Sequence, residues 1–390
     1  MMTNEETLRF IAAHADDEVA RVALMAHDPA VDLAFALQQI KGRQKAREKL
    51  PDYYACPEVL YPPTVNMEQC SSTATAQYKA SLVAGDTFAD LSGGFGVDTL
   101  HLARRFRQGI YVEPNAELAE LVTHNLTVLG APQVTTLVCT MEEALPQLEP
   151  ADWLYVDPSR RDGYGRRVID LSHCVPDVLA HWPVLMAKAR KGILLKLSPM
   201  LDIRQTLRQL PDTTDVQVVA LHGECKELLF MVRKETGPLT LTAVNLGTDE
   251  QPFAFTMEEE EQTLPSWSDG VGEWLYEPNA AIMKAGGYKT LTQRFAIRKL
   301  ALSTHLYTSD ERVEDFPGRC FKVRSVIPFH KQGIRQLATE VRQANVVVRN
   351  FPLTADELRA RLKVRDGGSL FLVGTTLAKG EKVLVVGEKA

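Results

Sequence analysis

The sequence predicts an α/β protein whose central part is a doubly wound parallel sheet. From Thr87 onward, short apolar runs of strand length alternate with helical stretches, an order typical of a parallel sheet that helices cover on both faces. Two later runs, Asp215–Leu221 and Glu227–Val232, are separated by a short turn, which favours an antiparallel hairpin because a parallel connection needs a dozen or more residues. Helical patterns precede this region and mixed patterns follow it, so we expect an N-terminal helical region and a C-terminal α+β module.

The parallel strands are expected at five apolar runs: Thr87–Leu91, Gly109–Val112, Val134–Cys139, Trp153–Val156 and Gly192–Leu197. Helices are expected between the first three, at Asp98–Phe106 and Ala116–Leu129. With the hairpin, these runs predict a seven-stranded sheet.

Outside the sheet, apolar residues at three- and four-residue spacing predict helices at Glu5–Ala20 and Val31–Leu50. The acidic segment Gly237–Pro265 is expected to be a boundary or an exposed hairpin loop, with Glu258 to Glu261 in solvent. After it, helices are expected at Ile334–Gln343 and Ala355–Leu362, among strands at Cys320–Ile327, Ala344–Val348, Ser369–Thr375 and Lys382–Val386. The expected parts are a helical region at 1–80, the sheet domain at 81–235, a connecting α+β module of ferredoxin-like type at 236–315 and a C-terminal domain at 316–390.

The composition is that of a globular protein. The chain has 390 residues, of which 45% are hydrophobic, and no run reaches the roughly 18 apolar residues of a membrane-spanning helix. The six cysteines are scattered without a C-x-x-C pair, and the nine histidines lack H-x-x-x-H or H-E-x-x-H spacing. We therefore expect no membrane partner, no disulfide framework and no metal site, and a reducing cytoplasm as the compartment.

Charge is distributed unevenly along the chain. Residues 281–365 contain 17 Lys and Arg against 7 Asp and Glu, a local balance of +10, whereas the whole chain carries −6. A basic segment on an acidic protein indicates a module that faces a polyanion, with nucleic acid as the favoured partner. The alternative is a helical surface rich in Lys and Arg that only faces water.

A glycine-rich loop follows the first expected strand. Asp90-Leu91-Ser92-Gly93-Gly94-Phe95-Gly96 lies where the strand turns into a helix, and its glycines allow a ligand to approach the backbone closely. A dinucleotide loop has G-x-G-x-x-G, but counted from Gly94 the third glycine is replaced by Thr99. Asp90 would also repel a pyrophosphate. A ligand with a cationic sulfonium and an amino acid end meets no such repulsion.

Three further residues are candidates for the same ligand. The second expected strand ends in Glu113, and a carboxylate at that position can accept hydrogen bonds from both ribose hydroxyls of a nucleoside. After the third expected strand, Met141 can cover the face of an adenine ring and Glu142 can bind its amino group.

Asp90, Ser92, Gly93, Gly94, Gly96 and Glu113 together resemble the cofactor site of class I S-adenosylmethionine (SAM) dependent methyltransferases, over roughly Thr87 to Val232. The resemblance implies a Rossmann-like, seven-stranded methyltransferase sheet, with the loop holding the methionine part of SAM and Glu113 holding its ribose. The segment Glu68 to Ala74 resembles an additional motif next to the cofactor in some members; a capped helix start explains it equally well.

The fourth expected strand leads into Asp157-Pro158-Ser159-Arg160-Arg161, at the edge of the sheet where ligands bind in open α/β folds. This segment resembles the Asp/Asn-Pro-Pro-aromatic motif of the same family. The resemblance implies that the Asp157 carboxylate and the Pro158 carbonyl accept hydrogen bonds from a target amine and align it with the methyl group.

The motif departs from the family pattern at two positions. Ser159 replaces the second proline, and Arg160 replaces the aromatic residue, as in the Asp-Pro-Pro-Arg variants of some RNA methyltransferases. Uracil-5 chemistry is disfavoured, because Leu195 to Met200 contains no cysteine nucleophile. Arg160 or Arg161 is expected to bind a phosphate; a salt bridge to the acidic body is the alternative.

The C-terminal segment from about Phe316 to Ala390 resembles the THUMP-like domain attached to some RNA methyltransferases, on its arrangement and its turn Arg349-Asn350-Phe351-Pro352. The residues expected to bind RNA there are Arg349, Arg359, Arg361 and Lys363. The leading hypothesis is a SAM-dependent methyltransferase acting on a base of structured RNA (tRNA or rRNA). The alternatives are a methyltransferase acting on a protein or a small molecule, and a catalytically silent RNA-binding protein.

Overall fold

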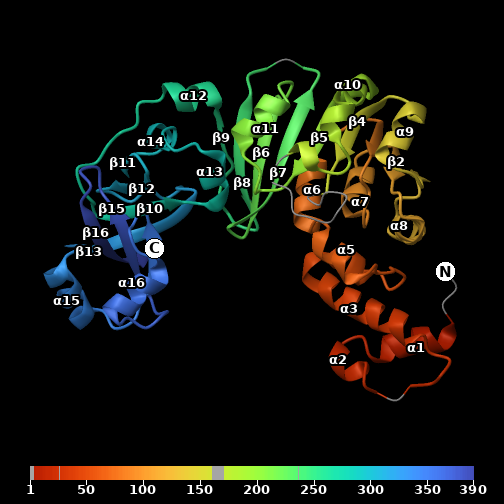
Figure 1. Ribbon diagram of the computed structural model, residues 1–390, viewed down its shortest axis with the longest axis horizontal. Coiled ribbons are helices and arrows are strands. Elements are labelled where there is room, and N and C mark those ends of the chain that lie inside the picture. Colours follow the sequence, from red (N-terminus) through yellow and green to blue (C-terminus); the bar gives the residue numbers. More distant parts are fainter. Residues whose placement is uncertain (1–3, 26, 160–170, 236) are drawn as a thin grey trace. The chain divides into compact units, whose positions relative to one another are not determined.

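A computed structural model describes residues 4–25, 27–159, 171–235 and 237–390 (Figure 1). The chain divides into two compact units. Unit 1 comprises Met1–Thr214 and Leu229–Gly237, and unit 2 comprises Asp215–Leu228 and Pro238–Ala390.

The first sheet has nine strands in the order β3-β2-β1-β4-β5-β7-β6-β8-β9. Its first five strands in the chain are β1 (Thr87–Asp90), β2 (Gln108–Val112), β3 (Val134–Leu137), β4 (Ala151–Val156) and β5 (Ala189–Leu197). Their pairs β1 with β2, β1 with β4, β2 with β3 and β4 with β5 are all parallel. The chain moves outward from β1 first in one direction and then in the other, which confirms the doubly wound parallel sheet.

The expected hairpin is formed by β6 (Asp215–Leu221) and β7 (Glu224–Arg233), which are neighbours in the sheet. His222 and Gly223 connect them, both with positive φ, at 51° and 82°. This backbone conformation matches the twist of a two-residue hairpin. The seven predicted strands are therefore confirmed.

Two further strands, β8 (Thr240–Leu246) and β9 (Phe253–Thr256), extend this sheet. They lie in Gly237–Pro265, where a boundary or an exposed hairpin loop was expected. The boundary between the two units does fall between Gly237 and Pro238, but the segment after it forms sheet strands rather than an exposed loop. Apolar side chains of both strands are buried, which explains why the segment is a part of the sheet: Leu241, Ala243, Val244, Phe253 and Phe255. The short helix α12 (Met257–Gln262) follows and buries Glu260.

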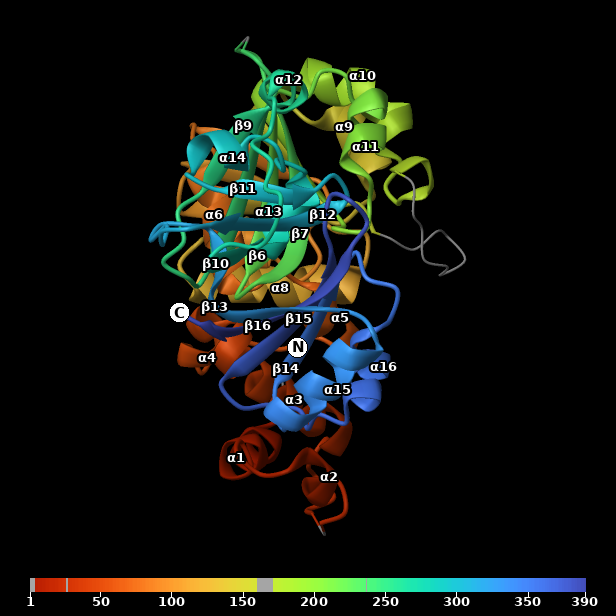
Figure 2. The same ribbon diagram turned by 90° about the vertical axis from the view of Figure 1, so that its left-hand side faces the viewer.

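Helices flank the parallel strands on both faces. The helices of this region are α6 (Thr73–Ser81), α7 (Val97–Ala103), α8 (Ala116–Val128), α9 (Met141–Gln147), α10 (Val178–Lys188) and α11 (Ile203–Gln209), with a 3-10 turn at Leu171–His173. Figure 2 shows α9, α10 and α11 on one side of the strands and α6 on the other. Their starts follow side-chain capping rules: Ser72, Asn115, Thr140, Asp177 and Asp202 each accept a hydrogen bond from a backbone N–H of the first turn.

The N-terminal helices of unit 1 are α1 (Glu5–Ala13), α2 (Val19–Val22), α3 (Leu33–Lys49), α4 (Pro51–Ala55) and α5 (Thr64–Gln69). The buried Gln39 side chain of α3 pairs with the backbone of Tyr61, accepting from its N–H at 2.8 Å and donating to its carbonyl at 2.9 Å. This pairing joins α3 to the segment that leads into the sheet.

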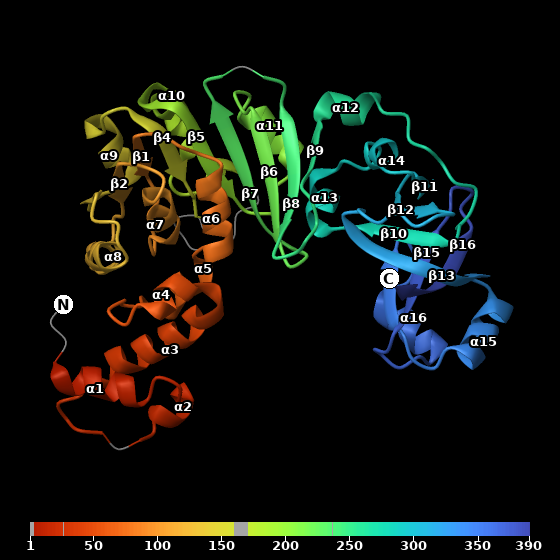
Figure 3. The ribbon, with the colours of Figure 1, turned by 180° about the vertical axis from the view of Figure 1, so that it is seen from behind.

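Unit 2 contains the second sheet, with the strand order β11-β12-β10-β13-β16-β15-β14. Its strands are β10 (Trp274–Pro278), β11 (Arg298–Ala301), β12 (Thr304–Ser309), β13 (Gly318–Pro328), β14 (Asn345–Arg349), β15 (Leu370–Thr376) and β16 (Lys382–Lys389). The helices are α13 (Ala280–Ala285), α14 (Leu291–Arg294), α15 (Lys331–Glu340) and α16 (Ala355–Leu362). Helices α15 and α16 lie together beside this sheet (Figure 3), where Leu337, Leu358 and Leu362 join its core.

Among the described residues, none of the helices combines the length and the apolar character that crossing a membrane requires. In the same part of the chain, no group of three or more His, Cys, Asp or Glu is arranged to hold a metal ion.

Candidate cofactor and active site

The glycine loop lies between β1 and α7 and is fastened to β2. Gly93 donates its N–H to the carbonyl of Val112 at 2.9 Å, and a Cβ on Gly93 would lie 2.0 Å from the Tyr111 ring. Gly94 and Gly96 have φ values of 52° and 71°, which side-chain-bearing residues rarely adopt. The loop therefore requires glycine for close packing at one position and for backbone conformation at two others.

Asp90 lies on the inner side of this loop. Its carboxylate is buried and accepts hydrogen bonds from the Ser92 N–H at 3.0 Å, the Ser92 hydroxyl at 3.3 Å and the Thr99 hydroxyl at 2.6 Å. Burial raises the pKa of Asp90 to about 7, although these hydrogen bonds oppose the shift. Thr99, which replaces the third glycine of a dinucleotide motif, thus holds the aspartate that shapes the loop.

Glu113, at the tip of β2, joins the same loop. Its two carboxylate oxygens accept the N–H groups of Gly94 at 3.0 Å and Asn115 at 2.9 Å. Burial raises the pKa of Glu113 above its ordinary value, against these two hydrogen bonds. Each oxygen keeps a second lone pair with which it can accept a ligand hydroxyl. The glycine loop and Glu113 are therefore hydrogen-bonded to each other, which agrees with the proximity expected from the sequence.

Ser92 connects the loop to the end of β4. Its hydroxyl accepts the backbone N–H of Asp157 at 2.6 Å. The Asp157 side chain is about a third exposed, at 34%, and forms an ion pair with Lys196 of β5. The loop and the motif that begins at Asp157 are thus adjacent at the carboxyl edge of the sheet.

A buried network of charges lies behind this edge, and the sequence analysis missed it. Asp98 accepts hydrogen bonds from the Ser71 hydroxyl at 2.7 Å and the Tyr155 hydroxyl at 2.8 Å, and it lies 3.2 Å from the Lys79 ammonium. Burial alone would raise the pKa of Asp98, but the charges of Lys79 and Lys196 and these hydrogen bonds outweigh it and lower the pKa.

The network gives a structural role to Ser71, in the segment Glu68–Ala74 that resembles a cofactor-adjacent motif. The two serines have different roles: Ser72 caps the start of α6, whereas the Ser71 hydroxyl donates a hydrogen bond to Asp98. A lysine inside the apolar run Leu194–Leu197 is the sequence signal that could have found Lys196.

Met141 and Glu142 begin α9, directly after β3. Met141 is buried and Glu142 is half-buried. The Glu113 N–H bonds to the carbonyl of Leu137 at 3.1 Å, so the ends of β2 and β3 are neighbours. Among the described residues, however, neither Met141 nor Glu142 hydrogen-bonds the loop.

Of the predicted acceptor motif after Asp157, the structure describes Pro158 and Ser159. Pro158 is buried, and the exposed Ser159 forms an isolated β-bridge with Val175, donating to its carbonyl at 2.6 Å. Arg160 and Arg161 lie outside the described residues.

The four basic residues predicted to bind RNA lie in unit 2, and two of them are engaged by carboxylates. Arg349 pairs with the buried Glu277, and Arg359 pairs with Asp356 at 2.9 Å. The guanidinium of Arg361 lies 5.1 Å from the ring centroid of Phe329. Lys363 is exposed and ends α16 in a left-handed conformation.

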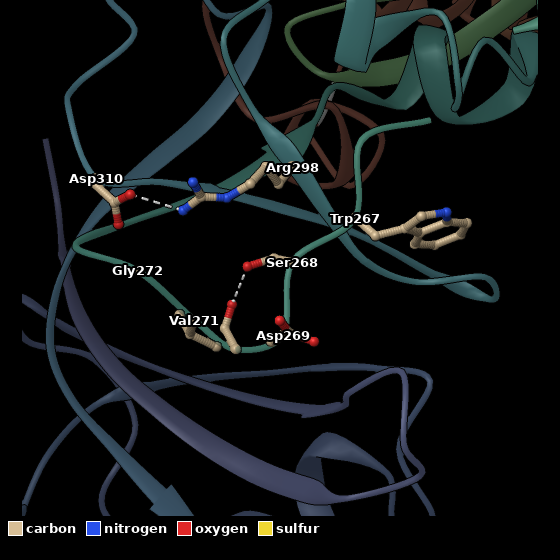
Figure 4. A pocket seen from close by; sticks show the side chains of 8 residues that line it. Trp267, Ser268, Asp269, Val271, Gly272, Arg298 and Asp310 are labelled. Carbon is tan, nitrogen blue, oxygen red and sulfur yellow. Dashed lines mark hydrogen bonds and ion pairs between the residues drawn. The ribbon is translucent and has the colours of Figure 1, made fainter. Parts of the chain in front are cut away.

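Unit 2 also contains a hollow of about 400 Å³ beside β11, lined by the loop from Trp267 to Gly272 (Figure 4). Arg298 and Asp310 pair with each other across it at 2.9 Å, and Ser268 bonds the carbonyl of Gly270.

The strand order of the first sheet, with its glycine loop and the acid at the tip of β2, defines the class of the protein: a class I SAM-dependent methyltransferase. The chain is similar to a crystal structure named "putative methyltransferase from Porphyromonas gingivalis W83", with 36% identity, a TM-score of 0.89 and 100% of both chains covered. The chain belongs to the family of that protein.

Further similarities agree with this assignment. Two Mycobacterium tuberculosis proteins, from strains CDC 1551 and H37Rv, are each named as uncharacterized SAM-dependent methyltransferases. Each is 22% identical over 321 residues, covering 80% of this chain and 84% of the relative. In unit 2, residues 274–317 match a ferredoxin-like domain family and residues 318–389 match a family described as THUMP domain-like.

The residues of the loop fit SAM chemically. A Cβ on Gly94 would have only the Ser92 carbonyl within 4 Å, at 3.8 Å, so the loop backbone is open on that side. Glu113, whose oxygens each keep a lone pair, suits a ligand with ribose hydroxyls, whereas the buried Asp90 holds the loop rather than facing the ligand.

Proposed function

We propose that the protein transfers a methyl group from SAM to a base in structured RNA. The observation that carries the proposal is the hydrogen bond of 2.6 Å between the Asp157 N–H and the Ser92 hydroxyl. It joins the glycine loop to the segment that resembles an amine-binding motif, so a methyl donor and an acceptor base could meet there.

On the cofactor side, the loop of Ser92, Gly93, Gly94 and Gly96 would bind the methionine part, with Asp90 holding the loop in shape. Glu113 would accept the ribose hydroxyls, and Met141 with Glu142 would border the adenine. When bound, SAM supplies an electrophilic methyl group on a sulfonium sulfur.

On the acceptor side, the Asp157 carboxylate and the Pro158 carbonyl would accept hydrogen bonds from the target amine and direct its lone pair toward the methyl group. Holding the reactants in this geometry can account for as much as about 7–11 kcal/mol of the barrier in favourable cases. Lys196 would position Asp157, since the ion pair fixes the carboxylate. Ser159 and Arg160 would complete this site, and Arg161 would bind a phosphate of the RNA.

RNA as the substrate is supported by the THUMP domain-like match at residues 318–389 and by the basic segment at 281–365. Arg349, Arg359, Arg361 and Lys363 would bind the RNA backbone, and Arg359 would do so by exchanging its exposed partner Asp356 for a phosphate. Six free cysteines are consistent with a reducing cytoplasm as the compartment.

The test is methyl transfer from labelled SAM to total tRNA and rRNA taken from cells that lack this protein. Wild-type protein should label one RNA species, and Asp157→Ala should abolish the labelling without loss of SAM binding. Lys196→Met should reduce kcat and leave SAM affinity unchanged. Mass spectrometry of the nucleosides then identifies the base.

The alternatives give different results. Labelling of a protein or small-molecule fraction, with salt-independent and negligible RNA binding, would support a non-RNA substrate. RNA methylation that is undiminished in Asp157→Ala would remove this residue from the mechanism, and RNA binding without any methylation would support a silent RNA-binding protein.

A further inference from the structure

A basic pocket lies at the amino edge of the sheet in unit 1, opposite the edge that carries the glycine loop. It has a volume of about 440 Å³. Five of its lining residues are cationic and only one, Glu235, is acidic; the cations are Arg105, Arg190, Lys191, Arg233 and Lys234. Its floor is formed by residues 81–84 and Trp153.

The sheet itself brings these cations together. Arg190 and Lys191 begin β5, whereas Arg233 ends β7, which runs in the opposite direction. The Lys234 N–H bonds to the carbonyl of Lys191 at 2.9 Å, which fixes the two strand ends side by side. Arg105 adds a charge from just beyond the end of α7.

Arg233 is held in place by the floor of the pocket. Its guanidinium lies 5.3 Å from the Trp153 ring centroid and donates to the Leu82 carbonyl at 3.2 Å. The indole N–H of Trp153 in turn donates to the carbonyl of Ala84 at 3.2 Å.

The other cations are only partly neutralised. Lys191 lies 3.4 Å from Asp152, with 53% of its side chain exposed, and the exposed Lys234 donates to the carbonyl of Met186. Arg105 and Arg190 are exposed, and neither has an ion pair among the described residues. Several like charges around one hollow attract an anion that carries more than one charge.

We propose that this pocket binds the phosphodiester backbone of the substrate RNA. The proposal rests on the proposed function and adds a second contact to it, on the edge of the sheet remote from the methyl transfer site. Strands of about five residues separate the two edges by about 17 Å, a distance that a folded RNA readily spans. A membrane surface is less suitable, because the apolar lining residues Val83 and Trp153 are only 3% and 5% exposed.

The test compares the double variant Arg105→Glu/Arg190→Glu with the control Arg208→Glu, which changes an exposed arginine of α11 outside the pocket. Binding of labelled total tRNA is measured by fluorescence anisotropy at several salt concentrations. The double variant should bind at least tenfold more weakly, and its salt dependence should be shallower, by a log–log slope of about 1 to 2. The control should change affinity less than threefold. SAM affinity measured on all three proteins verifies that the cofactor site is intact.

Three outcomes would overturn the proposal. Equal RNA affinity of the double variant and the control would remove the pocket from RNA binding while leaving the proposed function intact. Wild-type protein that binds and methylates no RNA would refute both. A pocket that binds inorganic phosphate or phosphatidylserine vesicles, with RNA affinity unaffected by the double variant, would assign it to another anion.

Discussion

The charged groups at the carboxyl edge of the first sheet and those around α16 in the second unit differ in their surroundings. Near the glycine loop, Lys79 and Asp98 pair with side chains only 1% and 11% exposed. On α16, Arg359 and Asp356 pair with side chains 31% and 86% exposed. The first pair is shielded from water on both sides. In the second pair Asp356 is exposed, while Arg359 is half-buried and also lies 3.5 Å from Asp366.

This difference decides what each region can do. Buried charges hold a fixed geometry, because an unpaired charge there is costly, and they can shape a cofactor loop. Solvated pairs contribute little stability and can exchange partners, which suits a surface that binds a polyanion.

Lys79→Met should destabilise the fold by about 3 kcal/mol, because it leaves Asp98 buried without its nearest cation. Lys196 and the hydroxyls of Ser71 and Tyr155 remain as partners, which keeps the loss from being larger. Urea unfolding measures it. The control is Lys45→Met, since Lys45 pairs with Glu68 at the surface and should cost about 1 kcal/mol or less. Equal losses of stability in the two variants would contradict the difference between the buried pair and the surface pair.

Gly93→Ala should cost about 2 kcal/mol and weaken SAM binding at least tenfold, because its Cβ would lie 2.0 Å from the Tyr111 ring. Gly94→Ala is the matched variant, with space for a Cβ and only its φ of 52° to oppose the change, at about 1 kcal/mol. Calorimetric titration with SAM and urea unfolding check both. A Gly93→Ala protein with wild-type stability would mean that the loop is not packed against β2 as described.

Asp90→Asn should change how stability depends on pH. The folded-state pKa of Asp90 is raised to about 7 by burial, so between about pH 4 and about pH 7 the folded protein holds a proton that the unfolded chain has lost. This contribution to stability is present at low pH and disappears as the pH rises through 7, by as much as about 4 kcal/mol. The asparagine variant should therefore gain stability relative to wild type as the pH rises from about 4 to about 7, and it should keep that gain at higher pH, as followed by urea unfolding. A difference that is constant with pH would contradict this.

Arg359→Ala should alter stability by no more than about 0.5 kcal/mol, because its ion pair is solvated. If the basic residues near α16 bind RNA, its RNA affinity should nevertheless fall, with a reduced salt dependence. Thermal unfolding and RNA anisotropy together distinguish the two effects. A large loss of stability with unchanged RNA affinity would make Arg359 a purely structural residue.

The sheet and the loop could be predicted from the sequence because local rules determine them. Apolar runs such as Trp153–Val156 favour buried strands at that length, and the glycines at 93, 94 and 96 mark a backbone that side chains would obstruct. The link of Gly94 to Glu113 follows from their places at neighbouring strand ends.

The partners of single charged residues could not be predicted, because they come from distant parts of the chain. Glu260, expected in solvent with its acidic neighbours, is buried and accepts the N–H groups of Lys289 and Thr290. Arg349, which the sequence indicates only as a positive charge, forms an ion pair with Glu277 of another strand. The ion pairs of Lys79 with Asp98 and of Lys196 with Asp157 likewise depend on the tertiary structure, which brings α6 and β5 next to these aspartates.

Calorimetric titration of the purified protein with SAM tests whether the loop from Asp90 to Gly96 and Glu113 together form the SAM site. We expect saturable heat at one SAM per chain, with the affinity reduced at least tenfold in Gly93→Ala and also reduced in Glu113→Ala. A folded wild-type protein that gives no heat, or a Glu113→Ala variant that binds SAM as tightly as wild type, would contradict it.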